Sequence, residues 1–155
     1  MEIPKFLDLA LELETEISKL YEIIAELSGD QPVAAQLRML ASAELNHANI
    51  IRRGIEFNEE APSLFEGIRM DPVEAAAGLD EARALHVSLE RGSIRFLAGL
   101  RKLLDIEERF ERIHIAASVV FTDSSMKALF GGLAVSDKSH VLTLRALIES
   151  YGGMA

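Results

Sequence analysis

Apolar residues recur at spacings of three and four along most of the chain, a pattern that predicts amphipathic helices. The first predicted helix begins near Pro4, a residue favoured in a first turn, and ends at Ser28-Gly29-Asp30. Its apolar positions are Phe6, Leu9, Ala10, Leu13, Ile17, Leu20, Ile24 and Leu27. Pro32 opens a second predicted helix that continues to about Phe57.

The second half of the chain also predicts helices, after a polar connection at 58–78. That connection is about 20 residues long, which is unusual within a compact domain, and a short helical turn is expected at 72–77. A third helix is predicted from Leu79 to Leu104. The amphipathic residues 105–121 either extend it or form an extra helix. The last helix follows an N-cap signal at Asp123-Ser124-Ser125, runs to Tyr151 and ends at Gly152-Gly153.

This order of elements predicts one all-α domain over residues 1–155. Two helices, a long connection and two further helices are the outline of a four-helix bundle with one long crossover. The extra helical segment, at 105–121, is expected between the third and fourth helices of the bundle.

Several acidic and histidine side chains fall on the apolar faces of these helices when each residue is advanced by 100°. Glu44 and His47 lie within the apolar stripe of the second helix, and Asp137 and His140 within that of the last. Glu14 is the inward-facing glutamate of the first helix. Two copies of an acid-x-x-His pattern are therefore expected to face the core.

The third helix gives a less clear pattern. Glu90 shares its face with apolar residues but also with Arg83 and Arg101, which places it at the edge of the core. Glu111 and His114 match the acid-x-x-His pattern too. Only 21 residues separate Glu90 from Glu111, against 30 between Glu14 and Glu44. The two would miss each other by roughly 7 Å along the helix axis, so Glu111 and His114 are expected on a solvated face.

The inward set combines four carboxylates with two imidazoles, and this combination favours metal binding. Unpaired carboxylates in a core repel one another and cost several kcal/mol each, unless they take up protons or bind cations. Oxygen and imidazole ligands without thiolate suit iron or manganese. A Glu from each of two helices and a Glu-x-x-His from each of the other two is the ligand plan of di-iron bundles. The candidate ligands are Glu14, Glu44, His47, Glu90, Asp137 and His140.

The chain also repeats internally. The segment LRMLASAELNH at 37–47 aligns with FGGLAVSDKSH at 130–140, sharing Leu-Ala, an acid and a histidine three residues after it. LETEISKLY at 13–21 aligns more weakly with LERGSIRFL at 89–97.

Composition excludes several other classes of protein. The chain has no cysteine, which rules out disulfides, zinc ribbons and iron–sulfur clusters. A formal net charge of −9 without a basic cluster argues against binding nucleic acid or anionic membranes. No apolar run approaches the roughly 18 residues of a membrane span, and the N-terminus lacks a signal-peptide pattern. A cytoplasmic location is expected.

With these motifs in order, the chain resembles the rubrerythrin-like branch of the ferritin-like superfamily. The resemblance rests on Glu14 with Tyr21 seven residues later, on Glu44 with His47, on Glu90 followed by Phe96 and Leu97, and on Asp137 with His140. It covers nearly the whole chain. Two departures are Asp137, one methylene shorter than the usual glutamate, and Leu97, which has no hydroxyl where a tyrosine is usual.

The resemblance implies a ferritin-like bundle that holds two iron ions, with manganese or zinc as other candidates. Glu44 and Asp137 would be the bridging, catalytic ligands, and Glu14 and Glu90 terminal ones. The implied reactions are peroxide reduction or oxidation of Fe(II) by peroxide or dioxygen. Electrons would come from a separate donor protein, because a cysteine-ligated rubredoxin module is absent.

A second hypothesis stays open at this point. The shortened Asp137 and the missing second tyrosine are also what a degenerate site would show, with Arg101 neutralising Glu90. The chain would then be a non-catalytic scaffold or dimerisation module. In either case, a homodimer is expected, with the amphipathic segment 105–121 as a possible interface.

Overall fold

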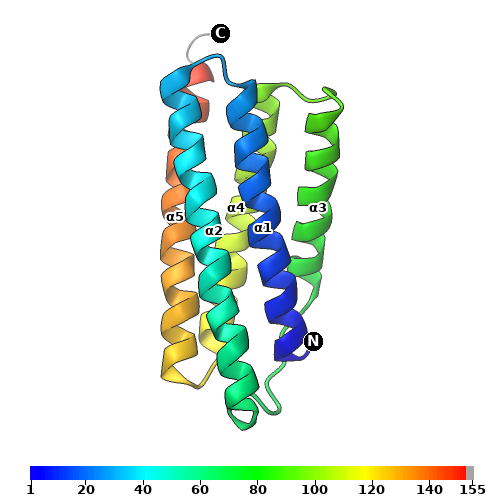
Figure 1. The fold of residues 1–155 in the computed structure, drawn as a ribbon, viewed down its shortest axis with the longest axis vertical. Helices are drawn as coiled ribbons and strands as arrows, with labels where there is room; N and C mark the ends of the chain where they lie inside the picture. Colours follow the sequence, from blue (N-terminus) through cyan, green and yellow to red (C-terminus); the bar gives the residue numbers. More distant parts are fainter. Residues whose placement is uncertain (153–155) are drawn as a thin grey trace.

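The computed structural model describes residues 1–152, and within them every regular element is helical (Figure 1). The elements are α1 (Ile3–Leu27), α2 (Gln31–Glu60), the short 3₁₀ helix η1 (Pro62–Leu64), α3 (Val73–Glu90), α4 (Phe96–Val120) and α5 (Ser124–Gly152). The predicted N-cap is confirmed, since the Asp123 side chain accepts hydrogen bonds from the backbone N–H groups of Ser125 and Met126. Gly153, expected to help end the last helix, lies outside the described residues.

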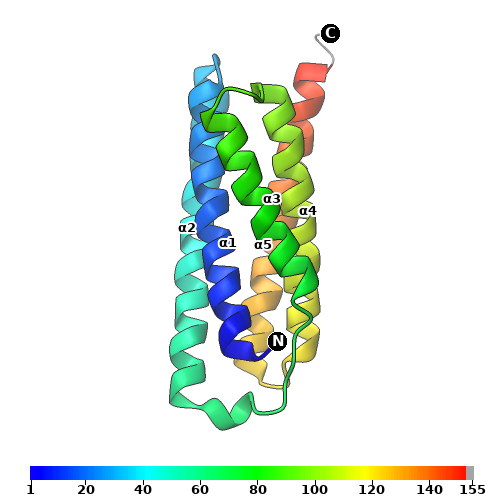
Figure 2. The ribbon, with the colours of Figure 1, turned by 90° about the vertical axis from the view of Figure 1, so that its right-hand side faces the viewer.

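Four long helices pack in two antiparallel pairs, α1 with α2 and α4 with α5 (Figure 1). The shorter α3 packs against α1 and α4 (Figure 2). It carries the chain from the end where α2 stops back to the opposite end, so α4 runs in the same direction as α2, and α5 in the same direction as α1. The two halves of the chain consequently present corresponding helices to a shared interior.

The helix predicted at 79–104 is wrong, because the chain breaks at residues 91–95. Gly92 adopts a left-handed conformation with φ of 67°, and both the backbone N–H and the hydroxyl of Ser93 donate hydrogen bonds to the Ser88 carbonyl. The turn expected at 72–77 belongs to α3, and residues 105–121 belong to α4 and the residue after it. The extra helix therefore lies inside the crossover between α2 and α4, not between the third and fourth long helices.

The apolar face of segment 105–121 is buried in the core of this chain. Ile106, Phe110, Ile113 and Ala117 are all buried against neighbouring helices. The amphipathic pattern that suggested an interface with a second copy is thus explained by the core of this chain. Among residues 1–152, no helix has the length and apolar composition that crossing a membrane requires.

The core consists of two apolar clusters with a polar layer where they meet. One cluster contains Ile17, Leu103 and Leu144, and the other contains Phe6 and Ile51. On each long helix, buried polar residues lie close to the point where residues of one cluster give way to residues of the other. These are Glu14, Glu44, His47, Glu107, His114, Asp137 and His140.

Candidate metal centre

Four carboxylates and three imidazoles meet in the polar layer, and each long helix contributes to it. Glu14 comes from α1, Glu44 and His47 from α2, Glu107 and His114 from α4, and Asp137 and His140 from α5. None of the seven exposes more than 4% of its surface. They sit on the inner stripes of amphipathic helices, at spacings of three or seven residues that keep the members of a helix on one face.

Two overlapping groups of these residues could each hold a metal ion. Glu14, Glu44, His47 and Asp137 each offer one donor atom, and these atoms lie within 4.8 Å of one another. Glu44, Glu107 and His140 form the second group by the same criterion. Glu44 belongs to both, so one carboxylate lies between two candidate ion positions.

The ring of His47 is oriented by contacts on both of its nitrogens. Its Nδ1 is 3.1 Å from Glu44 Oε2, 3.5 Å from Glu14 Oε2 and 3.7 Å from Asp137 Oδ1. Its Nε2 is 2.8 Å from the Ser136 hydroxyl on α5. The outer hydrogen bond therefore directs Nδ1 toward the carboxylates, which is the usual arrangement of a metal-binding histidine.

His140 occupies the corresponding place in the second group. Its Nδ1 contacts Glu44 Oε1 without hydrogen-bond geometry and is 3.7 Å from Glu107 Oε1. The rings of His47 and His140 stack with centroids 5.3 Å apart and planes 12° from parallel. Both imidazoles thus approach the shared Glu44.

Two further side chains, Tyr21 and His114, form hydrogen bonds with carboxylates of the layer. The Tyr21 hydroxyl donates a hydrogen bond to Glu107 Oε1. His114 places Nδ1 2.5 Å from Asp137 Oδ2, and Nε2 3.5 Å from Glu14 Oε1. Its ring lies among Phe110 and Phe130, which hold it on the side facing the layer.

The layer contains many buried polar atoms without hydrogen-bond partners, which is costly in a protein interior. They belong to carboxylates and imidazoles that face one another across the layer. They are both oxygens of Glu14, Glu44 Oε1, Glu107 Oε2, Asp137 Oδ1, His114 Nε2 and His140 Nδ1. Oxygen and imidazole nitrogen donors left unpaired in one dry place fit the requirements of divalent cations.

The acid–base properties of the layer reflect burial and mutual repulsion. Burial and the neighbouring Glu44 charge raise the pKa of Glu14 well above its usual value, and raise that of Glu107 to about 8. Burial alone would raise the pKa of Glu44 too, but the imidazoles of His140 and His47 outweigh it and lower that pKa. Burial opposes the charge on His140, yet Glu107 and Glu44 raise its pKa to about 10. Without metal, the raised pKa values of Glu14, Glu107 and His140 favour their protonated forms, and these protons reduce the negative charge of the layer.

Glu90, expected as a ligand, is not part of this layer. Its side chain is 64% exposed, and it contacts His86, 3.3 Å away on the same helix. Arg83 pairs with Glu12 instead. The prediction that Glu90 faces the interior is wrong because α3 packs on the outside of α1 and α4 rather than among the four long helices.

Glu107 and His114 both belong to the polar layer, although the sequence alone selected neither as a site residue. Glu107 precedes Asp137 by 30 residues, the separation between Glu14 and Glu44. His114 was expected on a solvated face and is fully buried, whereas Glu111 is partly exposed. The alignment of 37–47 with 130–140 has an offset of 93 residues. Applying that offset to LETEISKLY selects IEERFERIH at 106–114, and pairs Glu14 with Glu107 and Tyr21 with His114.

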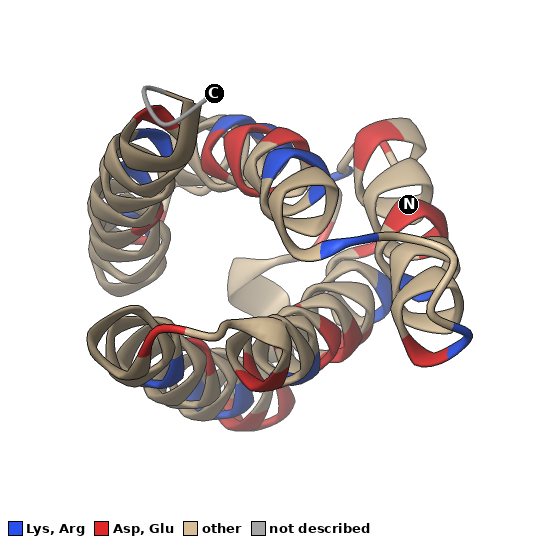
Figure 3. Cartoon of the chain, turned by 90° about the horizontal axis from the view of Figure 1, so that it is seen from above, with Lys and Arg blue, Asp and Glu red and all other residues tan. Residues whose placement is uncertain are grey.

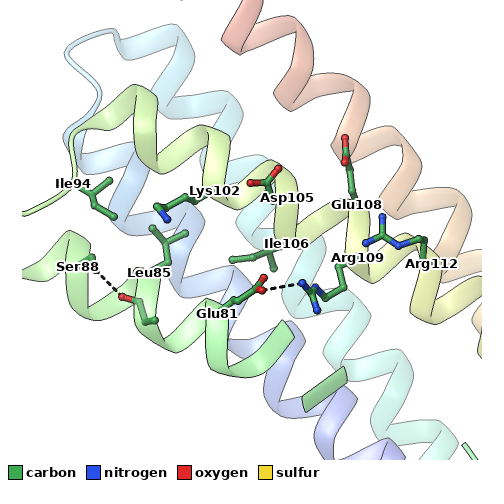
Figure 4. A pocket seen from close by; sticks show the side chains of 11 residues that line it. Glu81, Leu85, Ser88, Ile94, Lys102, Asp105, Ile106, Glu108, Arg109 and Arg112 are labelled. Atoms are coloured by element: carbon green, nitrogen blue, oxygen red, sulfur yellow. Dashed lines mark hydrogen bonds and ion pairs between the residues drawn. The ribbon is translucent and has the colours of Figure 1, made fainter. Parts of the chain in front are cut away.

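The groove between α3 and α4 does not reach this layer. It has a volume of 530 Å³ and a mixed lining, in which Arg109 donates a hydrogen bond to Glu81 (Figure 4). Its other charged lining residues are Lys102, Asp105, Glu108 and Arg112. None of the seven layer residues lines it. Figure 3 looks along the helices and shows acidic and basic residues intermingled over the protein. The buried layer is the chemically distinctive feature of the described residues.

Comparison of the chain with protein-family models, with curated proteins and with solved structures finds no match. The resemblance to rubrerythrins stays a hypothesis.

Proposed function

We propose that this protein is a rubrerythrin-like di-iron oxidoreductase with its metal centre in the buried layer. The first ion position would be formed by Glu14, Glu44, His47 and Asp137, and the second by Glu44, Glu107 and His140. The observation that carries the proposal is the set of seven unpaired carboxylate and imidazole atoms that face one another away from water.

Charge supports two divalent ions rather than one. Four carboxylates lie in the layer, and burial together with the neighbouring Glu44 charge raises the pKa values of Glu14 and Glu107, so that both groups favour their protonated forms. Two divalent cations would neutralise four carboxylates and would displace those protons. The oxygen and imidazole donors favour iron or manganese, and zinc is compatible with the same donors.

The residues divide into shared and terminal ligands. Glu44 belongs to both groups and is the bridging candidate. Glu14 and Glu107 are the terminal carboxylates, so Glu107 takes the role that the sequence alone assigned to Glu90. Asp137 was expected to bridge with Glu44, but its oxygen atoms reach only the first group.

Iron bound here would supply the redox chemistry, with peroxide or dioxygen as the oxidant and Fe(II) oxidation or peroxide reduction as the outcome. The chain's own contribution is to hold the ligands and to exclude water. Apolar clusters lie on both sides of the layer, while Tyr21 and His114 fix the orientation of Glu107 and Asp137. Electrons would arrive from a separate donor protein.

The scaffold hypothesis loses its main arguments. Glu90 next to an arginine suggested a degenerate site, but Glu107 supplies a buried carboxylate in the corresponding place. The missing second tyrosine is matched by His114, which also hydrogen-bonds a layer carboxylate. A scaffold gains nothing from seven unpaired buried polar atoms, since an apolar core would be more stable.

Anaerobic loading with Fe(II), metal analysis and then addition of hydrogen peroxide test this proposal. We expect close to two irons per chain and a change in visible absorption on oxidation. The double variant Glu44→Ala/His47→Ala should lose iron, whereas the control Leu45→Ala/Asn46→Ala, on the exposed side of α2, should not. Unchanged iron content in the first double variant would refute the ligand assignment.

A further inference from the structure

The two halves of the centre are related by a consistent offset in sequence, yet their contacts differ. Each residue of one half has a counterpart 93 positions later, with Glu14 paired to Glu107, Glu44 to Asp137 and His47 to His140. By the same offset Tyr21 corresponds to His114, and Ala43 corresponds to Ser136. The last two pairs differ in chemistry, and both differences involve hydrogen bonds to ligands.

The first difference concerns the carboxylate to which Tyr21, or its counterpart His114, forms a hydrogen bond. Tyr21 on α1 bonds the terminal carboxylate Glu107 of the other half. A symmetric arrangement would have His114 on α4 bond Glu14, but the distance from His114 Nε2 to Glu14 Oε1 is 3.5 Å and Nε2 has no hydrogen-bond partner. Instead, His114 Nδ1 is 2.5 Å from Asp137 Oδ2. His114 therefore holds the carboxylate that corresponds to the bridging Glu44.

This contact decides which ion position Asp137 can serve. With Oδ2 engaged by His114, the remaining oxygen Oδ1 is 3.7 Å from His47 Nδ1 and belongs to the first ligand group. The aspartate side chain is one methylene shorter than the glutamate in the matching place of α2. Asp137 is accordingly absent from the second ligand group, and that group has three members against four in the first.

The second difference reinforces the first. His47 in the first group is oriented by the Ser136 hydroxyl, 2.8 Å from its Nε2. The residue at the matching position of α2 is Ala43, which has no hydroxyl to offer His140. Within residues 1–152, the first position thus combines three carboxylates and an oriented histidine. The second combines two carboxylates and a histidine that lacks this support.

We propose that His114 is a positioning residue that makes the two metal positions inequivalent. It commits Asp137 to the first position, which binds its ion more tightly because it has more carboxylates and better-oriented ligands. The second position, with Glu44, Glu107 and His140 as its ligands, would fill after the first. This inference rests on the proposed metal centre and adds an order of binding to it.

Titration of the metal-free protein with Co(II) tests the proposal, using equilibrium dialysis for affinity and visible absorption for the coordination of each ion. The wild type should bind two ions in two resolved steps, the first at least about tenfold tighter than the second. His140→Ala should abolish the weaker step and retain the tighter one, and His47→Ala should abolish the tighter step. Two equivalent steps would overturn the inference and leave the metal centre standing, whereas no binding at all would refute the metal centre itself.

Variants of the two corresponding residues separate positioning from general structural damage. His114→Leu should weaken the first step by about tenfold to a hundredfold and change its cobalt spectrum, with little effect on the second. Tyr21→Phe should do the reverse, because it releases Glu107 of the second group. His114→Asn should restore much of the first step, since the asparagine amide nitrogen can occupy the place of Nδ1. The positioning role would be contradicted if His114→Leu and Tyr21→Phe weakened the same binding step. It would also be contradicted if His114→Leu lost a whole ion, or if His114→Asn failed to restore affinity.

Discussion

The Tyr21 hydroxyl on α1 donates a hydrogen bond to the Glu107 carboxylate on α4, and both side chains are fully buried. The bond joins the two halves of the chain across the polar layer. It also satisfies one oxygen of a carboxylate whose other oxygen has no partner. This contact stabilises the arrangement of the buried carboxylates in the metal-free protein.

Replacing Tyr21 with phenylalanine should therefore destabilise the metal-free protein. Loss of the donor leaves a buried carboxylate oxygen unpaired, which costs about 1–3 kcal/mol in the free energy of unfolding. Urea unfolding of the chelator-treated protein measures this. Tyr151→Phe is the matched control, because Tyr151 is partly exposed and packs its ring against Phe96. Equal effects of the two substitutions would contradict the structural importance of the Tyr21–Glu107 bond.

Removal of a buried carboxyl group that lacks hydrogen-bond partners should have the opposite effect on the metal-free protein. Neither oxygen of Glu14 has a hydrogen-bond partner, and burial raises its pKa. Glu14→Met should raise the free energy of unfolding of the metal-free protein by about 1–3 kcal/mol, the cost of burying a polar group without a hydrogen bond. The same variant should lose the stabilisation that added metal gives to the wild type. Glu22→Met, on the exposed side of α1, is the control, and a destabilised metal-free Glu14→Met would mean that the layer is better satisfied than its geometry indicates.

The stability of the metal-free protein should fall as pH rises through neutrality. The pKa of Glu107 is raised from 4.5 to about 8 and that of His140 from 6.5 to about 10, so the folded state keeps protons that the unfolded state releases. A raised pKa gives stability that is complete below the unfolded value and lost as pH rises through the folded one. The loss from Glu107 falls between about pH 4.5 and 8, that from His140 between about pH 6.5 and 10, and together they amount to several kcal/mol.

Thermal unfolding with chelator at about pH 5.5, 7 and 8.5 measures this dependence. Metal should reverse the trend, because ligands must lose their protons to bind and the affinity for metal rises with pH. A melting temperature of the metal-free protein that rises from pH 5.5 to 8.5 would contradict the assigned pKa directions.

The break between α3 and α4 predicts opposite effects for two glycine substitutions. Gly92 has a φ of 67°, and Gly92→Ala should cost about 1–2 kcal/mol because side chains disfavour this conformation. Gly131 lies within α5 with open space where a Cβ would sit, so Gly131→Ala should stabilise by about 0.5–1 kcal/mol. Denaturant unfolding of both variants compares them. A stabilising Gly92→Ala would indicate that helix continues through residues 91–95.

Much of the fold could be predicted from local pattern. The spacing of apolar residues located α1, α2 and α5 to within a few residues, and the same spacing placed Glu14, Glu44, His47, Asp137 and His140 on inner faces, where all five are buried. Each of these predictions depends only on which face of one helix a residue occupies. Their role as metal ligands stays a prediction.

The wrong predictions, the continuous helix at 79–104 and the inward-facing Glu90, depend on how one helix packs against another, which local sequence pattern does not reveal. Apolar spacing continues through residues 91–95, so it did not reveal the break, although Gly92 with Ser93 is a helix-ending signal. Choosing among Glu90, Glu107 and Glu111 required the register of one helix against another. The internal repeat contains that information, since its offset of 93 residues selects Glu107 and His114.

The measurement that tests the central claim most directly is the metal content of two glutamate variants after anaerobic Fe(II) loading. Glu107→Gln alters a fully buried layer carboxylate, and Glu90→Gln alters an exposed one on the neighbouring helix. We predict close to two irons per chain for the wild type and for Glu90→Gln, and the loss of about one iron for Glu107→Gln. Equal iron content in all three proteins, or loss of iron only in Glu90→Gln, would contradict a metal centre between α1, α2, α4 and α5.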